Sequence, residues 1–256
     1  GIRLLKAAIK TFHDYTHTHG ILHDKRNFTV RCQSNIPNLV GLAGSSAIIT
    51  ACYRALMTFY GITIPKQELA NIIRDTELKE LGISAGLQDR VIQVYQGLVY
   101  MDFNKDLIDR QGYGNYVSLD TSKLPNLYIA YRTDLSEMSD VFHNNIRARF
   151  NAGDKTIVDA MKFWGDITEE ALECLDNGNF EELSRLMNAN FDRRASIYNI
   201  SDGNLRMVDV ARACGACAKF TGSGGAIIGI YKDEKTYSKL VNELANHLDY
   251  AIFRLK

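Results

Sequence analysis

A glycine- and serine-rich segment, Gly41-Leu-Ala-Gly-Ser-Ser-Ala47, has the composition of a phosphate-binding loop. Small residues let the backbone approach a ligand closely. The segment runs into Ser45–Tyr60, which lacks Gly and Pro, is apolar nearly all round and therefore predicts a buried helix. N–H groups at a helix start favour phosphate, and a serine hydroxyl there can ligate Mg²⁺. The alternative is an ordinary helix whose N-cap is Ser45 or Ser46. A Walker A loop is excluded because no Lys precedes the serines.

A second glycine segment, Lys219-Phe-Thr-Gly-Ser-Gly-Gly-Ala226, lies between two apolar runs that predict strands. Glycines between strands often form only a hairpin turn, and this is the alternative interpretation. Two phosphate-sized loops in one chain are less easily explained by coincidence.

The acidic residues Glu77 and Asp89 flank a loop of small residues. One carboxylate could ligate Mg²⁺ while the other accepts the proton of a nucleophilic alcohol. Glu80 is an alternative to Glu77 as the metal ligand. The competing interpretation of both glutamates is a solvated helix face.

Several further residues could bind a ligand. Arg193 and Arg90 are candidates for a substrate carboxylate or for phosphates, because a guanidinium matches such groups with paired donors. A surface position is the alternative for Arg193. Ser139 is a candidate for sugar hydroxyls. Cys214-Gly-Ala-Cys217 is a lone CxxC, and no second pair of zinc ligands follows it.

Composition excludes several classes of protein. The chain has 256 residues, 46% of them hydrophobic, and balances 30 basic against 30 acidic residues. It can therefore bury a large core, and no bulk charge attracts nucleic acid or an anionic membrane. No stretch of about 18 apolar residues predicts a membrane span. Five scattered cysteines favour a reducing compartment, and we expect a cytoplasmic protein.

The periodicity of apolar residues predicts the elements that must position these groups. We expect helices at 2–19, 45–60, 66–79 and after 233, a mostly helical region at 139–214 with breaks near 151–154 and 177–179, and strands at 28–33, 97–103, 126–131, 218–221, 226–231 and 250–255. Strands and helices come partly in blocks, which predicts an α+β protein.

Three segments, Gly41–Ala47, Glu77–Arg90 and Lys219–Ala226, together resemble the GHMP kinases. This is the family of galactokinase, homoserine kinase and the mevalonate kinases. Gly41–Ala47 resembles the second motif of that family and Lys219–Ala226 its third. Within the family the resemblance narrows to plant-type kinases of glucuronate. The stretches that carry it include Glu80-Leu-Gly-Ile-Ser-Ala-Gly-Leu-Gln-Asp-Arg-Val91, Gly97-Leu-Val-Tyr-Met-Asp-Phe103 and Leu186-Met-Asn-Ala-Asn-Phe-Asp-Arg-Arg194.

The resemblance implies a two-lobed fold, with a ribosomal protein S5-like N-terminal lobe at 1–130 and a ferredoxin-like α+β C-terminal lobe at 131–256. It implies ATP and a sugar as ligands, Ser46 and Glu77 as Mg²⁺ ligands, and Asp89 as the catalytic base or the residue that orients the sugar hydroxyl. Arg90, Ser139 and Arg193 are substrate-binding candidates by their residue types alone. The phosphate-binding residues that it implies are Gly41, Leu42, Ala43, Gly44, Ser45, Ser46, Gly222, Ser223 and Gly224.

The activity that the resemblance implies is transfer of the ATP γ-phosphate to the anomeric hydroxyl of D-glucuronate. The alternatives are another sugar of the same family (arabinose, fucose, galactose or a heptose) and a non-catalytic sensor of sugar or nucleotide. The first motif of the family, roughly Pro-x-Arg-x-(Asn/Glu)-Leu, does not precede Gly1. We therefore expect a chain that lacks the start of its N-terminal lobe.

Overall fold

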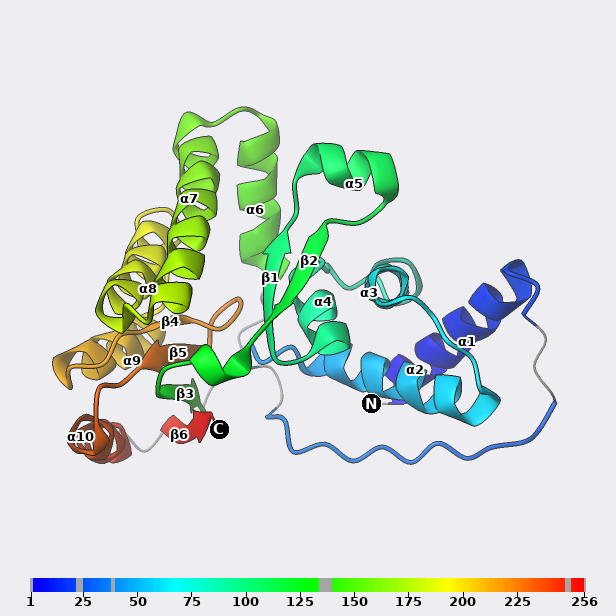
Figure 1. Ribbon diagram of the computed structural model, residues 1–256, viewed down its shortest axis with the longest axis horizontal. Coiled ribbons are helices and arrows are strands. Elements are labelled where there is room, and N and C mark those ends of the chain that lie inside the picture. Colours follow the sequence, from blue (N-terminus) through cyan, green and yellow to red (C-terminus); the bar gives the residue numbers. More distant parts are fainter. Residues whose placement is uncertain (1, 22–24, 38–39, 134–139, 247–249, 256) are drawn as a thin grey trace. The chain divides into compact units, whose positions relative to one another are not determined.

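The computed structural model describes residues 2–21, 25–37, 40–133, 140–246 and 250–255, without the side chains of 140–145 (Figure 1). Its contacts divide the chain into two compact units. The first unit comprises Gly1–Ile36 and Ala43–Thr121, and the second comprises Pro37–Leu42 and Ser122–Lys256. The first glycine segment therefore contributes Gly41 and Leu42 to the second unit and its remaining residues to the first.

The first unit is built mainly from helices. They are α1 (Ile2–Thr18), α2 (Gly44–Tyr60), α3 (Lys66–Asp75), the π-helical turn η1 (Thr76–Glu80) and α4 (Gln88–Tyr95). The predicted helices at 2–19, 45–60 and 66–79 are confirmed, although the last one changes from α- to π-helical geometry at Thr76. Apolar side chains of α2 such as Ile49 and Tyr53 are fully buried and pack against Phe12 of α1 and Ile73 of α3.

The first unit also contains an antiparallel pair of strands. β1 (Leu98–Asp102) pairs with β2 (Asn115–Leu119), and the short helix α5 (Lys105–Gln111) connects them. The predicted strand at 97–103 is confirmed as β1. α4, α5 and β2 were not predicted from the sequence. α5 buries none of its residues, so it lacks the apolar periodicity by which a helix is recognised.

The predicted strand at 28–33 is wrong. Residues 25–35 are mostly exposed and pair with no strand in the described ranges. Phe28 packs against the rings of Phe59 and Tyr60, with centroids 5.7 and 6.2 Å away, and Arg26 donates a hydrogen bond to the Phe59 carbonyl. β-branched residues and an alternating pattern therefore do not suffice to form a strand, because the backbone N–H and C=O groups of a strand also need a neighbouring strand as hydrogen-bond partner.

Helices make up much of the second unit. After the 3₁₀ turn η2 (Thr121–Lys123), they are α6 (Asp140–Asn151), α7 (Lys155–Asn177), α8 (Phe180–Ala195), α9 (Asp202–Ala213) and α10 (Glu234–Ala245). Both predicted helix breaks are confirmed. At each of them a short polar side chain caps the next helix: Asp154 accepts from Thr156 N–H, and Asn179 accepts from Glu182 N–H.

A four-stranded antiparallel sheet supports these helices. Its order is β4 (Lys219–Phe220), β5 (Ala226–Ile230), β3 (Leu127–Arg132) and β6 (Tyr250–Leu255) (Figure 1). Burial alternates along β3, where Tyr128 and Ala130 are fully buried. On that face Phe191 of α8, Met207 of α9 and Leu240 of α10 complete the core. No helix in the described ranges is long and apolar enough to cross a membrane.

Candidate active site

The start of α2 is left without a side-chain cap. Its N-cap residue is Ala43, in the left-handed conformation with φ 53°, and this residue makes no side-chain hydrogen bond to the first N–H groups. The Ser46 hydroxyl donates instead to the Ala43 carbonyl at 3.0 Å, and Ser46 is fully buried. The alternative of a conventional serine N-cap is therefore wrong. A left-handed alanine costs about 1–2 kcal/mol, and such strain concentrates at functional sites.

Four side chains of the first unit form a connected polar cluster: Ser45, Glu77, Asp89 and Arg90. The Ser45 hydroxyl donates to Glu77 Oε1 at 2.7 Å. Arg90 donates through Nε to Glu77 Oε2 at 2.5 Å, and its Nη2 pairs with the same oxygen. Arg90 Nη1 also lies 3.1 Å from Asp89 Oδ2. We call these four residues the carboxylate cluster.

Burial differs sharply across the carboxylate cluster. Glu77 has no solvent-exposed surface and the Arg90 side chain is 7% exposed, whereas the Asp89 side chain is 43% exposed. Arg90 therefore neutralises the buried glutamate and holds one oxygen of Asp89. The remaining surface of the Asp89 carboxylate is accessible to a ligand.

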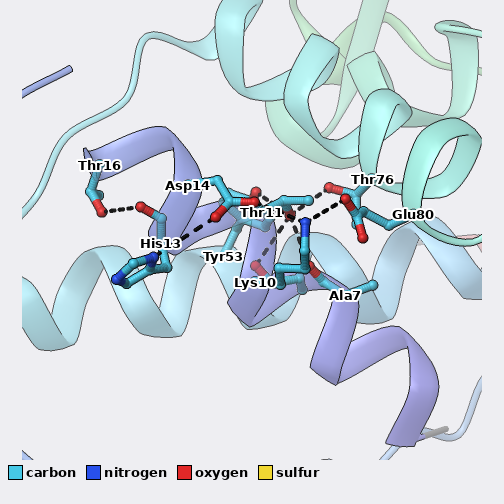
Figure 2. A network of polar contacts seen from close by, with 10 residues as sticks. Ala7, Lys10, Thr11, His13, Asp14, Thr16, Tyr53, Thr76 and Glu80 are labelled. Carbon is cyan, nitrogen blue, oxygen red and sulfur yellow. Dashed lines mark hydrogen bonds and ion pairs between the residues drawn. The ribbon is translucent and has the colours of Figure 1, made fainter. Parts of the chain in front are cut away.

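The sequence left Glu77 and Glu80 as alternatives, and they lie in different surroundings. Glu77 belongs to the carboxylate cluster, whereas Glu80 accepts a hydrogen bond from Lys10 of α1 at 2.6 Å (Figure 2). Both residues lie on η1, and π-helical turns are frequent at functional sites.

Hydrogen-bonded hydroxyl groups of Thr11, Tyr53 and Thr76 tie the start of η1 to α1 and α2. Thr76 Oγ1 donates to the Ile72 carbonyl and lies 2.8 Å from Thr11 Oγ1. The Tyr53 hydroxyl also donates to Thr11 Oγ1, at 2.8 Å (Figure 2). Thr76 immediately precedes Glu77, so this network fixes the backbone from which the buried glutamate projects.

In the second unit, the two glycine segments pack against each other. The Thr221 hydroxyl donates to the Gly41 carbonyl at 3.0 Å. Gly41 has φ +72°, and a Cβ at this position would lie 2.2 Å from the Gly224 carbonyl oxygen. A Cβ on Gly225 would lie 3.2 Å from Val40 Cα. These glycines are therefore required by the close approach of two backbone segments, beyond the needs of an isolated hairpin turn.

Arg194 and Lys219 flank the loop of residues 221–225 that joins β4 to β5, which we call the glycine hairpin. Arg194 donates through Nη1 to the Gly222 carbonyl and through Nη2 to the Ser223 carbonyl, both at 2.9 Å. Its guanidinium also lies over the rings of Tyr198 and Phe220. Burial and the charge of Arg194 lower the pKa of Lys219 to about 8.

Neither of these cations was predicted from the sequence as a site residue. The predicted residue was Arg193, whose Nη2 donates to the Thr156 carbonyl at 3.4 Å. The only sequence signal for Lys219 was its place at the start of the glycine segment. The only sequence signal for Arg194 was that it follows Arg193. Adjacency does not reveal which of the two arginines contacts the hairpin.

The remaining sequence candidates have definite places, with one exception. Ser139 lies outside the described residues. Cys214 and Cys217 are buried, which raises the pKa of both thiols, and Cys217 Sγ accepts a hydrogen bond from Ile230 N–H. No group of three His, Cys, Asp or Glu side chains converges as a metal site in the described part of the chain.

Comparison with known proteins identifies the family. The model of the GHMP kinases N terminal domain matches residues 3–97, and that of the GHMP kinases C terminal domain matches residues 171–249. The chain belongs to the GHMP kinases, and it has their α+β fold.

Two curated relatives are particularly similar. Glucuronokinase 1 of Arabidopsis thaliana is 42% identical over 248 residues, which span 95% of this chain and 68% of the relative. Probable glucuronokinase 2 of the same plant is 43% identical over 250 residues, with the same coverage. Among solved structures, mevalonate kinase of Methanococcus jannaschii aligns with a TM-score of 0.73 and 21% identity, over 98% of this chain and 74% of the other.

Proposed function

We propose that this protein is an ATP-dependent sugar 1-kinase that converts D-glucuronate to glucuronate 1-phosphate. The observation that carries the proposal is the carboxylate cluster, which presents one accessible carboxylate, Asp89, beside a fully buried ion pair. The choice of glucuronate is supported by 42% and 43% identity to two glucuronokinases over 95% of the chain.

Asp89 is the proposed proton acceptor. The anomeric oxygen forms a bond to the γ-phosphorus, the bond between that phosphorus and the β–γ bridging oxygen breaks, and the hydroxyl proton passes to the Asp89 carboxylate. Arg90 holds Asp89 Oδ2 at 3.1 Å, which orients the carboxylate for this step. Positioning and electrostatic stabilisation supply most of the catalysis in phosphoryl transfer.

The phosphates are proposed to bind at the two glycine segments. The uncapped start of α2 offers the N–H groups of Gly44 and Ser45, which carry the positive end of the helix dipole. Gly41, Leu42 and Ala43 stay predicted phosphate contacts. Gly222, Ser223 and Gly224 of the glycine hairpin stay predicted phosphate contacts of the second unit.

The donor groups of the carboxylate cluster fit Mg²⁺, which prefers hard oxygen ligands and is usually bound by one or two carboxylates together with substrate phosphates. Glu77 stays the proposed carboxylate ligand. The hydroxyl that touches it belongs to Ser45, whereas the predicted Ser46 hydroxyl bonds to Ala43. Bound Mg²⁺ would neutralise phosphate charge. Arg90 would then share the Glu77 carboxylate with the ion.

We further propose a cytoplasmic location, and neither nucleic acid nor membrane as a partner. All five cysteines are free thiols, which supports a reducing compartment. The balanced formal charge, 30 basic against 30 acidic residues, favours no polyanion.

A screen of ATP consumption tests the proposed activity. The full-length protein should phosphorylate D-glucuronate faster than galacturonate, galactose, arabinose, fucose or a heptose. Asp89→Asn should lower kcat by about 10²-fold or more, the usual contribution of a general base, while ADP binding persists.

Other results would redirect the proposal. A preference for a neutral sugar would place the protein with another sugar kinase of the family. Measurable binding of sugar and nucleotide without any turnover would favour a sensor. A near-normal rate for Asp89→Asn would remove Asp89 from the mechanism.

A further inference from the structure

The glycine hairpin is held by a cation, Arg194, which donates to two of its carbonyls. Neither Arg194 nor Lys219 lies within ion-pair distance of a carboxylate in the described part of the chain, and buried Arg194 Nε has no hydrogen-bond partner there. Other arginines of the second unit do find carboxylates: Arg212 pairs with Asp192 at 2.7 Å, and Arg254 with Glu234 at 2.6 Å.

This lack of a counter-charge is costly for the protein alone. Desolvation lowers the pKa of both Arg194 and Lys219, since burial disfavours their charged forms. Buried charges are usually paired, and perturbed titratable groups gather at functional sites. An external anion would compensate the two charges.

The bonds from Arg194 also determine where the peptide N–H groups of the hairpin point. No peptide bond in the described ranges is cis, so each carbonyl points opposite to the N–H group of the next residue. With the carbonyls of Gly222 and Ser223 bound to Arg194, the N–H groups of Ser223 and Gly224 point away from it. Neither N–H group donates to another described residue, whereas Gly225 N–H donates to Asn204.

The proposed function already assigns phosphate to the glycine hairpin. We propose that two residues outside its glycines, Arg194 and Lys219, prepare the hairpin for that phosphate. Arg194 is a positioning residue that turns the N–H groups of Ser223 and Gly224 toward the anion, and Lys219 supplies positive charge. Successive backbone N–H groups in a turn form a concave site for anions, and glycines allow a bulky anion to approach. The assignment to nucleotide phosphate rests on the proposed kinase function.

The geometry favours phosphate over the carboxylate of a sugar acid. A carboxylate is recognised best by the paired donors of a free arginine fork. Both Nη atoms of Arg194 already donate to carbonyls, which leaves fewer paired donors for a carboxylate. The Lys219 ammonium is a point charge, which suits a phosphate oxygen, and it has donors left beside its bond to the Phe220 carbonyl.

Calorimetric titration of the full-length protein with ADP, inorganic phosphate and D-glucuronate tests the proposal. We expect Lys219→Met to weaken ADP binding by about tenfold or more, the loss of one charge-assisted hydrogen bond. Arg194→Met should weaken ADP and phosphate binding similarly, and Arg194→Lys should restore part of the affinity. Glucuronate binding should stay the same in all three variants. Lys232→Met, at an exposed lysine of the same unit, is the matched control and should bind ADP normally.

Two results would overturn the proposal. One is unchanged ADP affinity in folded Lys219→Met. This variant removes the charge and one hydrogen bond, to the Phe220 carbonyl, but leaves the bonds from Arg194 to the hairpin in place, so it keeps the test decisive if Arg194→Met fails to fold. The other is a loss confined to glucuronate, which would make this a carboxylate site. If the wild-type protein does not phosphorylate glucuronate but the ADP pattern holds, the proposed substrate is wrong and the phosphate site stands.

Discussion

Replacing Lys219 by methionine should stabilise the protein while it weakens ADP binding. The pKa of Lys219 lies at about 8 instead of the usual 10.5, because of burial first and the charge of Arg194 second. At about 1.36 kcal/mol per pKa unit, the buried ammonium costs the folded state roughly 3 kcal/mol at pH 7. Loss of the bond to the Phe220 carbonyl offsets about 1–2 kcal/mol of this gain. We therefore expect the variant to be about 1–2 kcal/mol more stable.

The pH dependence isolates the charge from the lost hydrogen bond. Because the folded pKa of Lys219 is depressed, the unfolded chain binds more protons than the native chain between about pH 8 and pH 10.5. The contribution of this group to the free energy of unfolding of the wild-type protein therefore rises as the pH rises through that window, because Lys219 loses its proton in the folded state first. The variant lacks this contribution. The advantage of the variant should therefore shrink by about 2 kcal/mol between pH 7 and pH 10.

Urea denaturation of the full-length protein and its variant at pH 7 and pH 10 measures both quantities. Lys232→Met is the control, since an exposed lysine should give no difference at either pH. The reasoning would be refuted if Lys219→Met were less stable than wild type at pH 7 and the difference in unfolding free energy were the same at pH 10.

Three more substitutions test the packing of the site by urea denaturation. Gly41→Ala should cost more than about 2 kcal/mol, because its Cβ would lie 2.2 Å from the Gly224 oxygen and its φ is positive. Glu77→Ala should cost about 3–5 kcal/mol, since it removes the buried carboxylate that pairs with Arg90 and leaves that cation only the half-exposed Asp89, and adding Arg90→Met should recover much of this. Thr76→Val should cost about 1–3 kcal/mol through its lost hydrogen bonds, and should also lower kcat if the network positions Glu77.

Matched controls separate these mechanisms from general effects. Gly20→Ala has a similar φ of +63° but no atom within 4 Å, so it should cost only about 1–2 kcal/mol. Thr50→Val removes a buried hydroxyl that bonds only within its own helix, to Ser46, and should cost about 1 kcal/mol. Equal losses for Gly41→Ala and Gly20→Ala would contradict the close approach of the two glycine segments.

Much of the fold could be predicted because its signals are local. α2 is apolar nearly all round, and the breaks between α6, α7 and α8 coincide with Asp154 and Asn179, whose side chains cap the next helix. Prediction failed where stability depends on a distant partner. Residues 28–33 have strand-like composition but no ladder partner in the described ranges, and β2 alternates too weakly to be recognised without β1. The predicted lobe boundary at 130 stays a prediction.

The site divides in the same way. The sequence by itself determined the two glycine segments, the spacing of the acidic residues and the membership in a kinase family, because residue type and local order suffice for these. Only the tertiary structure decided between chemically similar neighbours. It placed Glu77 with Ser45 and left Glu80 with Lys10, and it turned Arg194 to the glycine hairpin. The physical reason is that a charged side chain takes its role from partners 28 to 70 residues away in the chain, and local sequence cannot specify those partners.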